Sequence, residues 1–213
     1  MRKMMWLVGV AMFAVAHLAG AVELKEGQNF MTYKPQRDTE ARDKIEVTEF
    51  FWYGCGHCFH LEPELQKWLK TLPKDVSFRR VPAVFPGRDG SPGQWASGTA
   101  LYYTLDAMGL GEKLHSDIFN AVNIERADVL SEKGMIDWLG KKGVDTKTFS
   151  ATYQSFAIRS KVLRAMQISQ AHGLDGVPAL IVDGRYRAIN GEDTFAVVDS
   201  LIDKARKDRA AKK

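Results

Sequence analysis

Cysteine is scarce in this sequence: its 213 residues include two, Cys55 and Cys58. Two thiols cannot form the several bridges that hold a small secreted domain together, so a disulfide scaffold is excluded. A structural zinc ion takes four ligands, so a zinc site built mainly from cysteine is excluded as well. The two cysteines lie three positions apart, which makes this single pair the feature to interpret.

An excess of charge of one sign is also lacking. Lys and Arg number 30 and Asp and Glu 26, so the formal net charge is +4, and both signs are mixed along the chain. This excess is too small to indicate a nucleic-acid partner, and none is expected. With 45% hydrophobic and 26% charged residues, the composition is typical of one or two globular domains with a substantial core.

The apolar run at the N-terminus is too short to cross a membrane. It covers residues 4–16, whereas a bilayer-spanning helix needs roughly 20 residues. Arg2 and Lys3 precede the run, and the small-x-small pattern Ala19-Gly20-Ala21 follows it. We therefore predict a cleaved signal peptide at residues 1–21, with an uncleaved N-terminal anchor as the alternative. Cleavage would remove Arg2 and Lys3, lower the net charge to +2 and export the chain to a compartment where disulfides form.

The first half of the chain carries a strand, helix, strand pattern. Residues 22–44 are polar and are expected to form an extended lead-in. Residues 45–52 alternate between apolar and polar and end in aromatics, which predicts a strand that becomes buried. A helical period follows from Cys55 and ends before Pro73, and residues 76–81 alternate again. The two strands of such a βαβ unit should be parallel.

The middle of the chain, to about residue 165, has helical rather than strand periodicity. Apolar stripes predict helices near residues 95–108 and 114–122, a short helix around 136–139, and a long one from Phe149 to a stop at Gly173. Asp183-Gly184, between residues 179–182 and 185–189, indicates a β-hairpin. A last helix is predicted from Thr194 to about Lys207. The sequence thus indicates an α/β fold interrupted by a helical block.

The pair Cys55 and Cys58 lies where the buried strand passes into a helix. Unpaired N–H groups and the helix dipole at a helix N-terminus stabilise an anion, so a thiolate is favoured at Cys55. His57 adds a positive charge or a hydrogen bond to the same sulfur. Cys58, one turn later, should be more buried and close enough to form a disulfide with Cys55. A disulfide that can release such a stable thiolate is reactive and oxidising.

Other uses of this motif are possible from the residues alone. Attachment of c-type haem needs a histidine directly after the second cysteine, where this chain has Phe59. A metal could bind Cys55, Cys58 and His60, and a passive structural disulfide would close only a very small ring. The metal and structural alternatives remain open at this point.

Two separated motifs and the helical block between them resemble the DsbA family of thiol:disulfide oxidoreductases, in the thioredoxin superfamily. The motifs are Glu49-Phe50-Phe51-Trp52-Tyr53-Gly54-Cys55-Gly56-His57-Cys58 and Gly176-Val177-Pro178-Ala179. The resemblance implies an α/β thioredoxin fold with an inserted all-helical domain. Its expected parts are a signal peptide (1–21), the first part of the thioredoxin-like domain (22–85), the helical insertion (86–165) and the second thioredoxin-like part (166–213).

The resemblance also assigns roles to residues. It makes Cys55 the nucleophile that meets the substrate and Cys58 the buried partner, with His57 between them. Val177 and Pro178 match a cis-proline loop that packs against the disulfide and pairs its backbone with substrate. Glu49 matches a buried acid that tunes proton transfer; an edge-facing glutamate is the ordinary alternative. Arg80 stands where the family usually has lysine, and arginine keeps its proton more firmly.

Two further residues differ from the usual family pattern or add to it. Gly56-His57 replaces the frequent Pro-His dipeptide, as in protein disulfide isomerases, while the histidine is retained. Pro63 lies five residues after Cys58, as in thioredoxin, and is expected to kink the active-site helix.

The resemblance implies a periplasmic, monomeric dithiol oxidase without cofactor or metal. Its expected partners are reduced or unfolded exported proteins and, as reoxidant, a membrane quinone reductase of the DsbB type. A disulfide isomerase or reductase is the nearest rival, although dimeric isomerases carry an extra N-terminal domain and only residues 22–44 precede the first predicted strand. A chaperone-like module that uses Trp52, Tyr53, Phe59 and Val177, or a metal carrier, would be a function of another class.

Overall fold

The computed structural model describes residues 22–211. The predicted signal peptide at residues 1–21 lies outside this part of the chain. Among the helices of residues 22–211, none combines the length and the apolar character that crossing a membrane requires.

A five-stranded mixed sheet forms the centre of one half of the molecule, with strand order β1-β5-β4-β2-β3. Strands β2 (Ile45–Phe51) and β3 (Val76–Pro82) are parallel and joined by helix α1 (Gly56–Leu69), which confirms the predicted βαβ unit. Strands β4 (Ala179–Val182) and β5 (Tyr186–Ala188) form the predicted hairpin. Asp183 and Gly184 both have positive φ, 55° and 60°, as a type I′ turn requires.

Strand β1 (Phe30–Thr32) was not anticipated in the lead-in. It pairs antiparallel with β5 at the edge of the sheet, where Phe30 lies opposite Ala188. Three residues are too few to show an alternating apolar and polar pattern, so the sequence around β1 does not predict a strand. The strand forms because β5 offers it an edge with which to pair.

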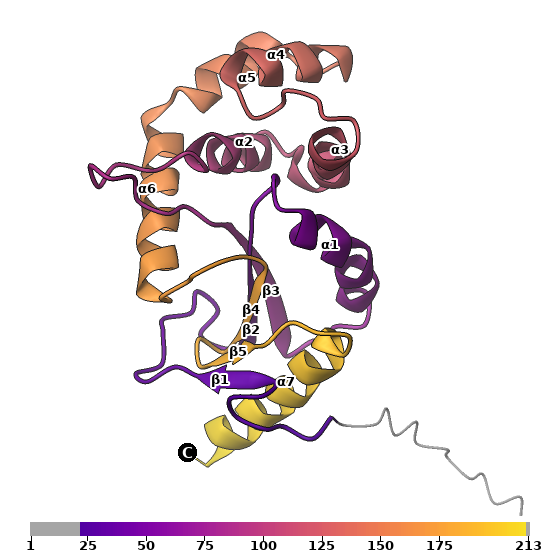
Figure 1. Ribbon diagram of the computed structural model, residues 1–213, viewed down its shortest axis with the longest axis vertical. Coiled ribbons are helices and arrows are strands. Elements are labelled where there is room, and N and C mark those ends of the chain that lie inside the picture. The colour runs from indigo at the N-terminus through magenta and orange to yellow at the C-terminus, as the bar shows by residue number, and fades with distance from the viewer. Residues whose placement is uncertain (1–21, 212–213) are drawn as a thin grey trace, which may run out of the picture.

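Helices cover both faces of the sheet. Helix α1 and helix α7 (Thr194–Ala210) share one core with β2 and β4, in which Leu65, Val198 and Leu201 meet Val47 and Leu180. On the other face, helix α6 (Phe156–Ala171) packs Ile158, Val162 and Ala165 in a core with Phe50 and Ile181. In Figure 1, α6 runs along one side of the sheet and α1 and α7 lie on the other.

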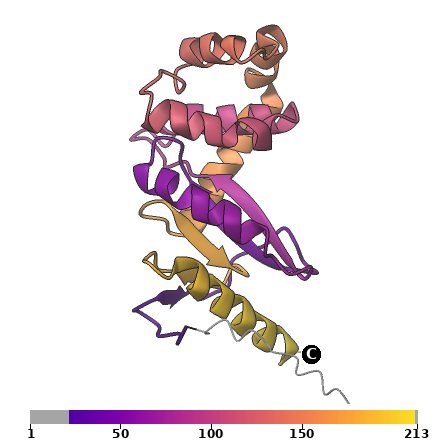
Figure 2. The same cartoon turned by 90° about the vertical axis from the view of Figure 1, so that its right-hand side faces the viewer.

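The remaining helices form a block beyond the end of the sheet. They are α2 (Ala96–Ala107), α3 (Gly111–Asn123), α4 (Glu132–Lys141) and α5 (Thr146–Tyr153). Figures 1 and 2 show α4 and α5 at the end of the molecule farthest from α7, with α2 and α3 between them and the sheet. The core of the block includes Leu101, Ile118 and Phe119, and extends to Tyr53 and Cys58. The block therefore packs directly against the cysteine motif.

The single long helix predicted from Phe149 to Gly173 is wrong, because the chain breaks between α5 and α6. Ser155 is extended, at φ −68° and ψ 154°, and its side chain accepts a hydrogen bond from Ile158 N–H as the N-cap of α6. The helical spacing of apolar residues continues across the break, which is why the sequence predicted one helix. Ser155 nevertheless ends the run, because it caps the start of a new helix. Helix α6 then runs without a break across residue 165, where the expected boundary of the insertion lies.

Candidate active site

Cys55 and Cys58 lie at the first turn of α1, at the junction of the sheet and the helical block. Cys55 is the N-cap residue, in extended conformation at φ −90° and ψ 112°. Its sulfur accepts a hydrogen bond from the backbone N–H of Cys58 at 3.3 Å. Cys58 is fully buried and Cys55 partly exposed, and the geometry that follows is that of the two thiols.

The two thiols differ strongly in acidity. Hydrogen bonding from the Cys58 side chain, then from the backbone N–H groups of Cys58 and His57, and the charge of His57 outweigh burial and lower the pKa of Cys55 to about 6. Burial raises the pKa of Cys58 far above its ordinary value, and its hydrogen bond to Cys55 adds to this. At neutral pH the negative charge therefore resides on Cys55, at the helix N-terminus.

The loop at Val177-Pro178 meets the cysteines from the other end of the chain. The carbonyl oxygen of Val177 lies 3.4 Å from the Cys55 sulfur, within reach of a hydrogen bond from the thiol. The Val177-Pro178 peptide bond is cis, as expected. Asn190, just after β5, lies beside the start of β4, and its Nδ2 donates to the carbonyl oxygen of Pro178 at 2.6 Å, which holds the loop in place.

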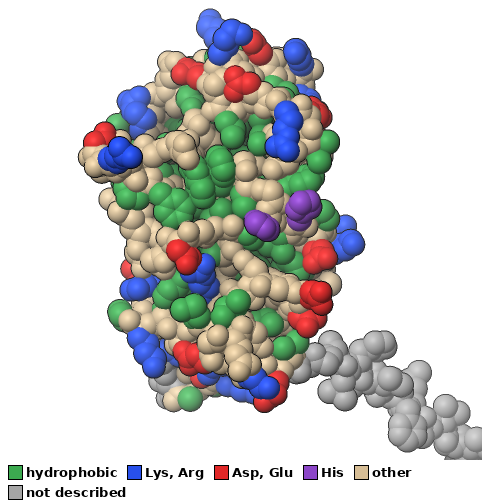
Figure 3. All heavy atoms as spheres, viewed as in Figure 1, with side chains coloured by type: hydrophobic (Ala, Val, Ile, Leu, Met, Phe, Trp, Pro, Cys, Tyr) green, Lys and Arg blue, Asp and Glu red, His purple; other side chains and the backbone are tan. Residues whose placement is uncertain are grey.

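The surface beside the motif is apolar. His57 and His60 are exposed, whereas Phe59 and Val177 are partly buried. Figure 3 shows histidine side chains at the edge of a broad apolar surface that continues onto the helical block. An apolar surface of this breadth is typical of a site that binds another molecule.

Glu49 lies buried on β2, an interior strand, and not at an edge of the sheet. It faces Arg80 on β3, and Arg80 Nε donates to Glu49 Oε2 at 3.1 Å. Burial raises the pKa of Glu49 to about 7 despite the opposing charge of Arg80. A carboxyl group with this pKa can take up or release a proton near neutral pH.

Sequence reasoning missed two members of this buried cluster, Glu62 and His115. Arg80 Nη2 also donates to Glu62 at 3.0 and 3.3 Å. His115 Nε2 lies 3.6 Å from Glu62, and Nδ1 lies 3.0 Å from the hydroxyl of Tyr53. Glu62 follows Cys58 by four positions and thus shares its buried helix face, a signal that periodicity could have given. His115 carried the same signal, because it precedes Ile118 and Phe119 by three and four positions and so lies on the buried face of α3.

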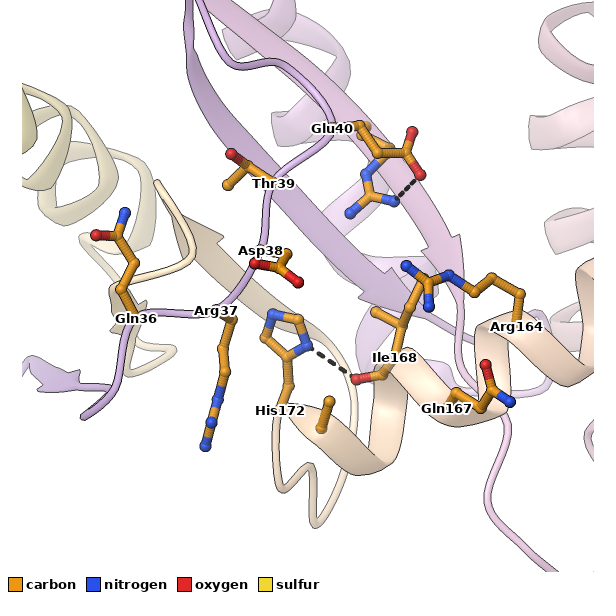
Figure 4. A pocket seen from close by; sticks show the side chains of 11 residues that line it. Gln36, Arg37, Asp38, Thr39, Glu40, Arg164, Gln167, Ile168 and His172 are labelled. Atoms are coloured by element: carbon orange, nitrogen blue, oxygen red, sulfur yellow. Dashed lines mark hydrogen bonds and ion pairs between the residues drawn. The ribbon is translucent and has the colours of Figure 1, made fainter.

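The pocket in Figure 4 is a separate feature from the cysteine motif. It is lined by residues 36–40, Arg79 and the end of α6, where His172 Nδ1 donates to the carbonyl oxygen of Ile168 at 2.8 Å. None of the predicted site residues lines it. Within residues 22–211, no three His, Cys, Asp or Glu side chains come together as a metal-ligand set.

Comparison with known proteins identifies the family. The family model described as DSBA-like thioredoxin domain matches residues 46–203. The thiol:disulfide interchange protein DsbA of Pseudomonas aeruginosa is 37% identical over 216 residues, covering 97% of this chain and 99% of its own length. The protein of the same name from Azotobacter vinelandii is 36% identical and covers 94% of each chain.

Solved structures agree with the sequence comparison. The crystal structure of Pseudomonas aeruginosa DsbA has a TM-score of 0.78 at 36% identity and covers 88% of this chain and 96% of its own. The oxidoreductase NmDsbA1 from Neisseria meningitidis has a TM-score of 0.76 at 27% identity. These matches confirm the expected thioredoxin fold with a helical insertion. On sequence, fold and dithiol geometry together, the chain belongs to the DsbA family of protein thiol:disulfide oxidoreductases.

Proposed function

We propose that this oxidoreductase works as a dithiol oxidase, which introduces disulfide bonds into exported proteins in the periplasm. The difference in acidity between Cys55 and Cys58 supports this direction of reaction most strongly. A thiolate held at Cys55 by the helix N-terminus stabilises the dithiol form, so the Cys55–Cys58 disulfide gives up its bond readily to substrate thiols.

The reaction proceeds in two exchange steps. A substrate thiolate attacks the Cys55 sulfur, the Cys55–Cys58 bond breaks, and Cys58 leaves with the electron pair and takes up a proton. A second substrate thiolate then attacks the substrate sulfur in this mixed disulfide and displaces Cys55 as a thiolate. The substrate has lost two electrons and gained a disulfide, and the enzyme is left as the dithiol.

Glu49 is the proposed proton donor and acceptor for Cys58. Cys58 is buried, so its thiolate cannot take a proton directly from bulk water. Glu49 is buried nearby, and its charge is one of the influences that raise the pKa of Cys58. With its own pKa raised to about 7, Glu49 can hold a proton at neutral pH and release it when needed.

Val177 and Pro178 form the proposed binding loop for the substrate chain. The loop lies against Cys55, and the Val177 carbonyl oxygen reaches the reacting sulfur. A substrate segment in extended form could pair its backbone with this loop and so bring its cysteine to Cys55. The apolar surface around the motif would favour unfolded over folded substrates.

The same proposal includes partners and organisation. Each turnover leaves a dithiol, so the enzyme needs an electron acceptor, for which we propose a quinone reductase of the DsbB type in the membrane. We propose that the enzyme is a monomer. We also propose the division into thioredoxin-like parts (22–85 and 166–213) around a helical insertion (86–165).

Three measurements test this function. The equilibrium of the Cys55/Cys58 pair with glutathione should favour the dithiol, and a reduced substrate should be oxidised faster than a scrambled one is reshuffled. A pair that stays a disulfide in the same buffer, as in thioredoxin, would indicate a reductase instead. Cys55→Ser should abolish turnover of reduced substrate. If the wild type oxidised no substrate, and both it and Cys55→Ser protected unfolded chains from aggregation, the protein would be a chaperone.

A further inference from the structure

His115 connects the helical block to the charges beneath the cysteines. It lies on α3, is 2% exposed, and its ring packs edge-on against Phe51 and Phe119 at centroid distances of 5.2 and 5.1 Å. Within this apolar shell, both ring nitrogens point at polar groups. Nδ1 lies 3.0 Å from the Tyr53 hydroxyl and Nε2 3.6 Å from Glu62 Oε2.

The contacts determine which nitrogen carries the proton. Burial raises the pKa of Tyr53 well above its ordinary value, so the phenol keeps its proton and can donate it to Nδ1. Burial also lowers the pKa of His115, which makes the ring neutral. A neutral ring that accepts at Nδ1 carries its proton on Nε2, so an N–H dipole faces the Glu62 carboxylate. The other tautomer would turn a lone pair toward that negative charge.

Glu62 accepts hydrogen bonds from two elements and is faced by a ring nitrogen from a third. Arg80 Nη2 on β3 and Gln66 Nε2 on α1 donate to its Oε1 at 3.0 and 2.6 Å, and His115 on α3 faces its Oε2. Burial alone would raise the pKa of Glu62, but the opposing contributions of His115, Arg80 and Gln66 lower it. Glu62 is therefore a carboxylate at neutral pH.

The charge of Glu62 affects Glu49 because both carboxylates share Arg80. Arg80 Nε binds Glu49 at 3.1 Å, while Nη2 binds Glu62 at 3.0 Å. A charged Glu62 raises the pKa of Glu49 by repulsion and engages part of the guanidinium. If Glu62 became neutral, Arg80 would serve Glu49 alone, and Glu49 would hold its proton less firmly.

We propose that His115, oriented by Tyr53, is a positioning residue that keeps Glu62 charged against Arg80 and thereby keeps Glu49 able to exchange a proton with Cys58. The role of Glu49 in this proposal rests on the proposed function. The orientation of His115 and its effect on the carboxylates do not depend on it.

Other titratable groups face the same cluster and must stay constant in any test. Around His115 and Glu49 they come from every packed element: Tyr102 on α2, Glu112 on α3, Arg80 on β3, Glu62 on α1, and Cys55 and Cys58 at the helix start. The variants below leave all of these groups unchanged.

The test compares two substitutions of His115 that each keep one of its contacts. In His115→Gln the amide nitrogen can occupy the place of Nε2 and still present an N–H group to Glu62. In His115→Asn the shorter amide can still accept from Tyr53 but does not reach Glu62. Infrared spectra of the dithiol protein, recorded against pH, follow the protonated carboxyl band that Glu49→Gln removes.

We expect the midpoint of the Glu49 band to move down by about one pH unit in His115→Asn and to stay near the wild-type value in His115→Gln. Tyr53→Phe removes the hydroxyl that orients the ring, and the midpoint should move in the same direction by less. The ultraviolet titration of the Cys55 thiolate should change little in all three.

His172→Asn is the matched control, because His172 is another buried histidine, packed on Phe50 at 4.9 Å. Its Nδ1 donates to the backbone of Ile168, so this variant should not move the Glu49 midpoint. An unchanged midpoint in a folded His115→Asn protein, or equal shifts in the Asn and Gln variants, would refute the proposal. Absence of oxidase activity in the wild type would instead refute the proposed function. The titration would still show whether His115 affects the protonation of Glu49.

Discussion

The acidity of Cys55 arises from groups that a single substitution can remove. The Cys58 side chain contributes most to lowering the pKa of Cys55, followed by backbone N–H groups and then the charge of His57. A backbone N–H survives every side-chain change except one to proline, so part of the effect should persist in other variants. The side chains of Cys58 and His57 can therefore be ranked by experiment.

The thiolate of Cys55 should titrate near pH 6 in the dithiol protein, as measured by its ultraviolet absorbance or by its rate of alkylation. Cys58→Ala removes the largest contribution and should raise this pKa more than His57→Ala does. Cys58→Ser keeps a hydroxyl donor of similar size and serves as the control. A larger effect of His57→Ala than of Cys58→Ala would contradict the order of causes given above.

Glu49 should make the stability of the dithiol form depend on pH. Its pKa rises from 4.5 to about 7 on folding, so the native state binds more protons than the unfolded state within this window. The free energy of unfolding should therefore fall as the pH rises from about 4.5 to about 7. Urea unfolding of reduced protein across this range should show a flatter curve for Glu49→Gln, and the contribution of Cys55 cancels in the difference. Parallel curves for the two proteins would show that Glu49 titrates normally.

At the scale of single elements, capping residues decide where helices begin. Ser131, Asp145 and Ser155 each accept a hydrogen bond from backbone N–H groups at the start of α4, α5 and α6. Of these, Ser155 matters most to the architecture, because it separates α6, which packs on the sheet, from α5 in the helical block.

Ser155→Ala should therefore destabilise the protein by about 1 kcal/mol, the usual effect of losing an N-cap side chain. Ser150→Ala is a suitable control, because Ser150 lies inside α5 and its hydroxyl donates to the carbonyl oxygen of Thr146. Alanine is a strong helix former there, so little loss is expected. The midpoints of urea unfolding distinguish the two; equal losses would mean that the cap contributes nothing specific.

At the scale of the whole molecule, Arg80 joins the sheet to α1 by buried charge and touches the helical block through one exposed carboxylate. It is buried and binds carboxylates from three elements: Glu49 on β2, Glu62 on α1 and Glu112 on α3. The Glu112 side chain is exposed, so its ion pair with Arg80 contributes little. The buried pairs dominate.

Arg80→Met should leave Glu49 and Glu62 buried without their cation and destabilise the protein by about 3–5 kcal/mol at neutral pH. The loss should shrink at acidic pH, where both carboxylates are protonated, and in the double variant Arg80→Met/Glu49→Gln. Thermal and urea unfolding at two pH values provide the measurement. A loss that is the same at both values would assign the role of Arg80 to packing of its stem rather than to charge.

The sequence alone determined the features that depend on neighbours along the chain. The alternating residues of β2 and β3, the Asp183-Gly184 turn and the place of Cys55 at a helix start follow from periodicity, turn chemistry and helix termini, all of which act over a few residues. The Val177-Pro178 loop was reached through resemblance to a family, because nothing in its local pattern links it to Cys55.

Only the tertiary structure decided the contacts between distant segments. It placed the Val177 carbonyl oxygen 3.4 Å from the Cys55 sulfur, paired the three-residue strand β1 with β5, and gathered Glu49, Glu62, Arg80 and His115 into one buried cluster. The physical reason is that such contacts arise when apolar faces pack, and the polar groups carried inward must then find each other. Periodicity predicts which face of an element is buried, but not which partner it meets there.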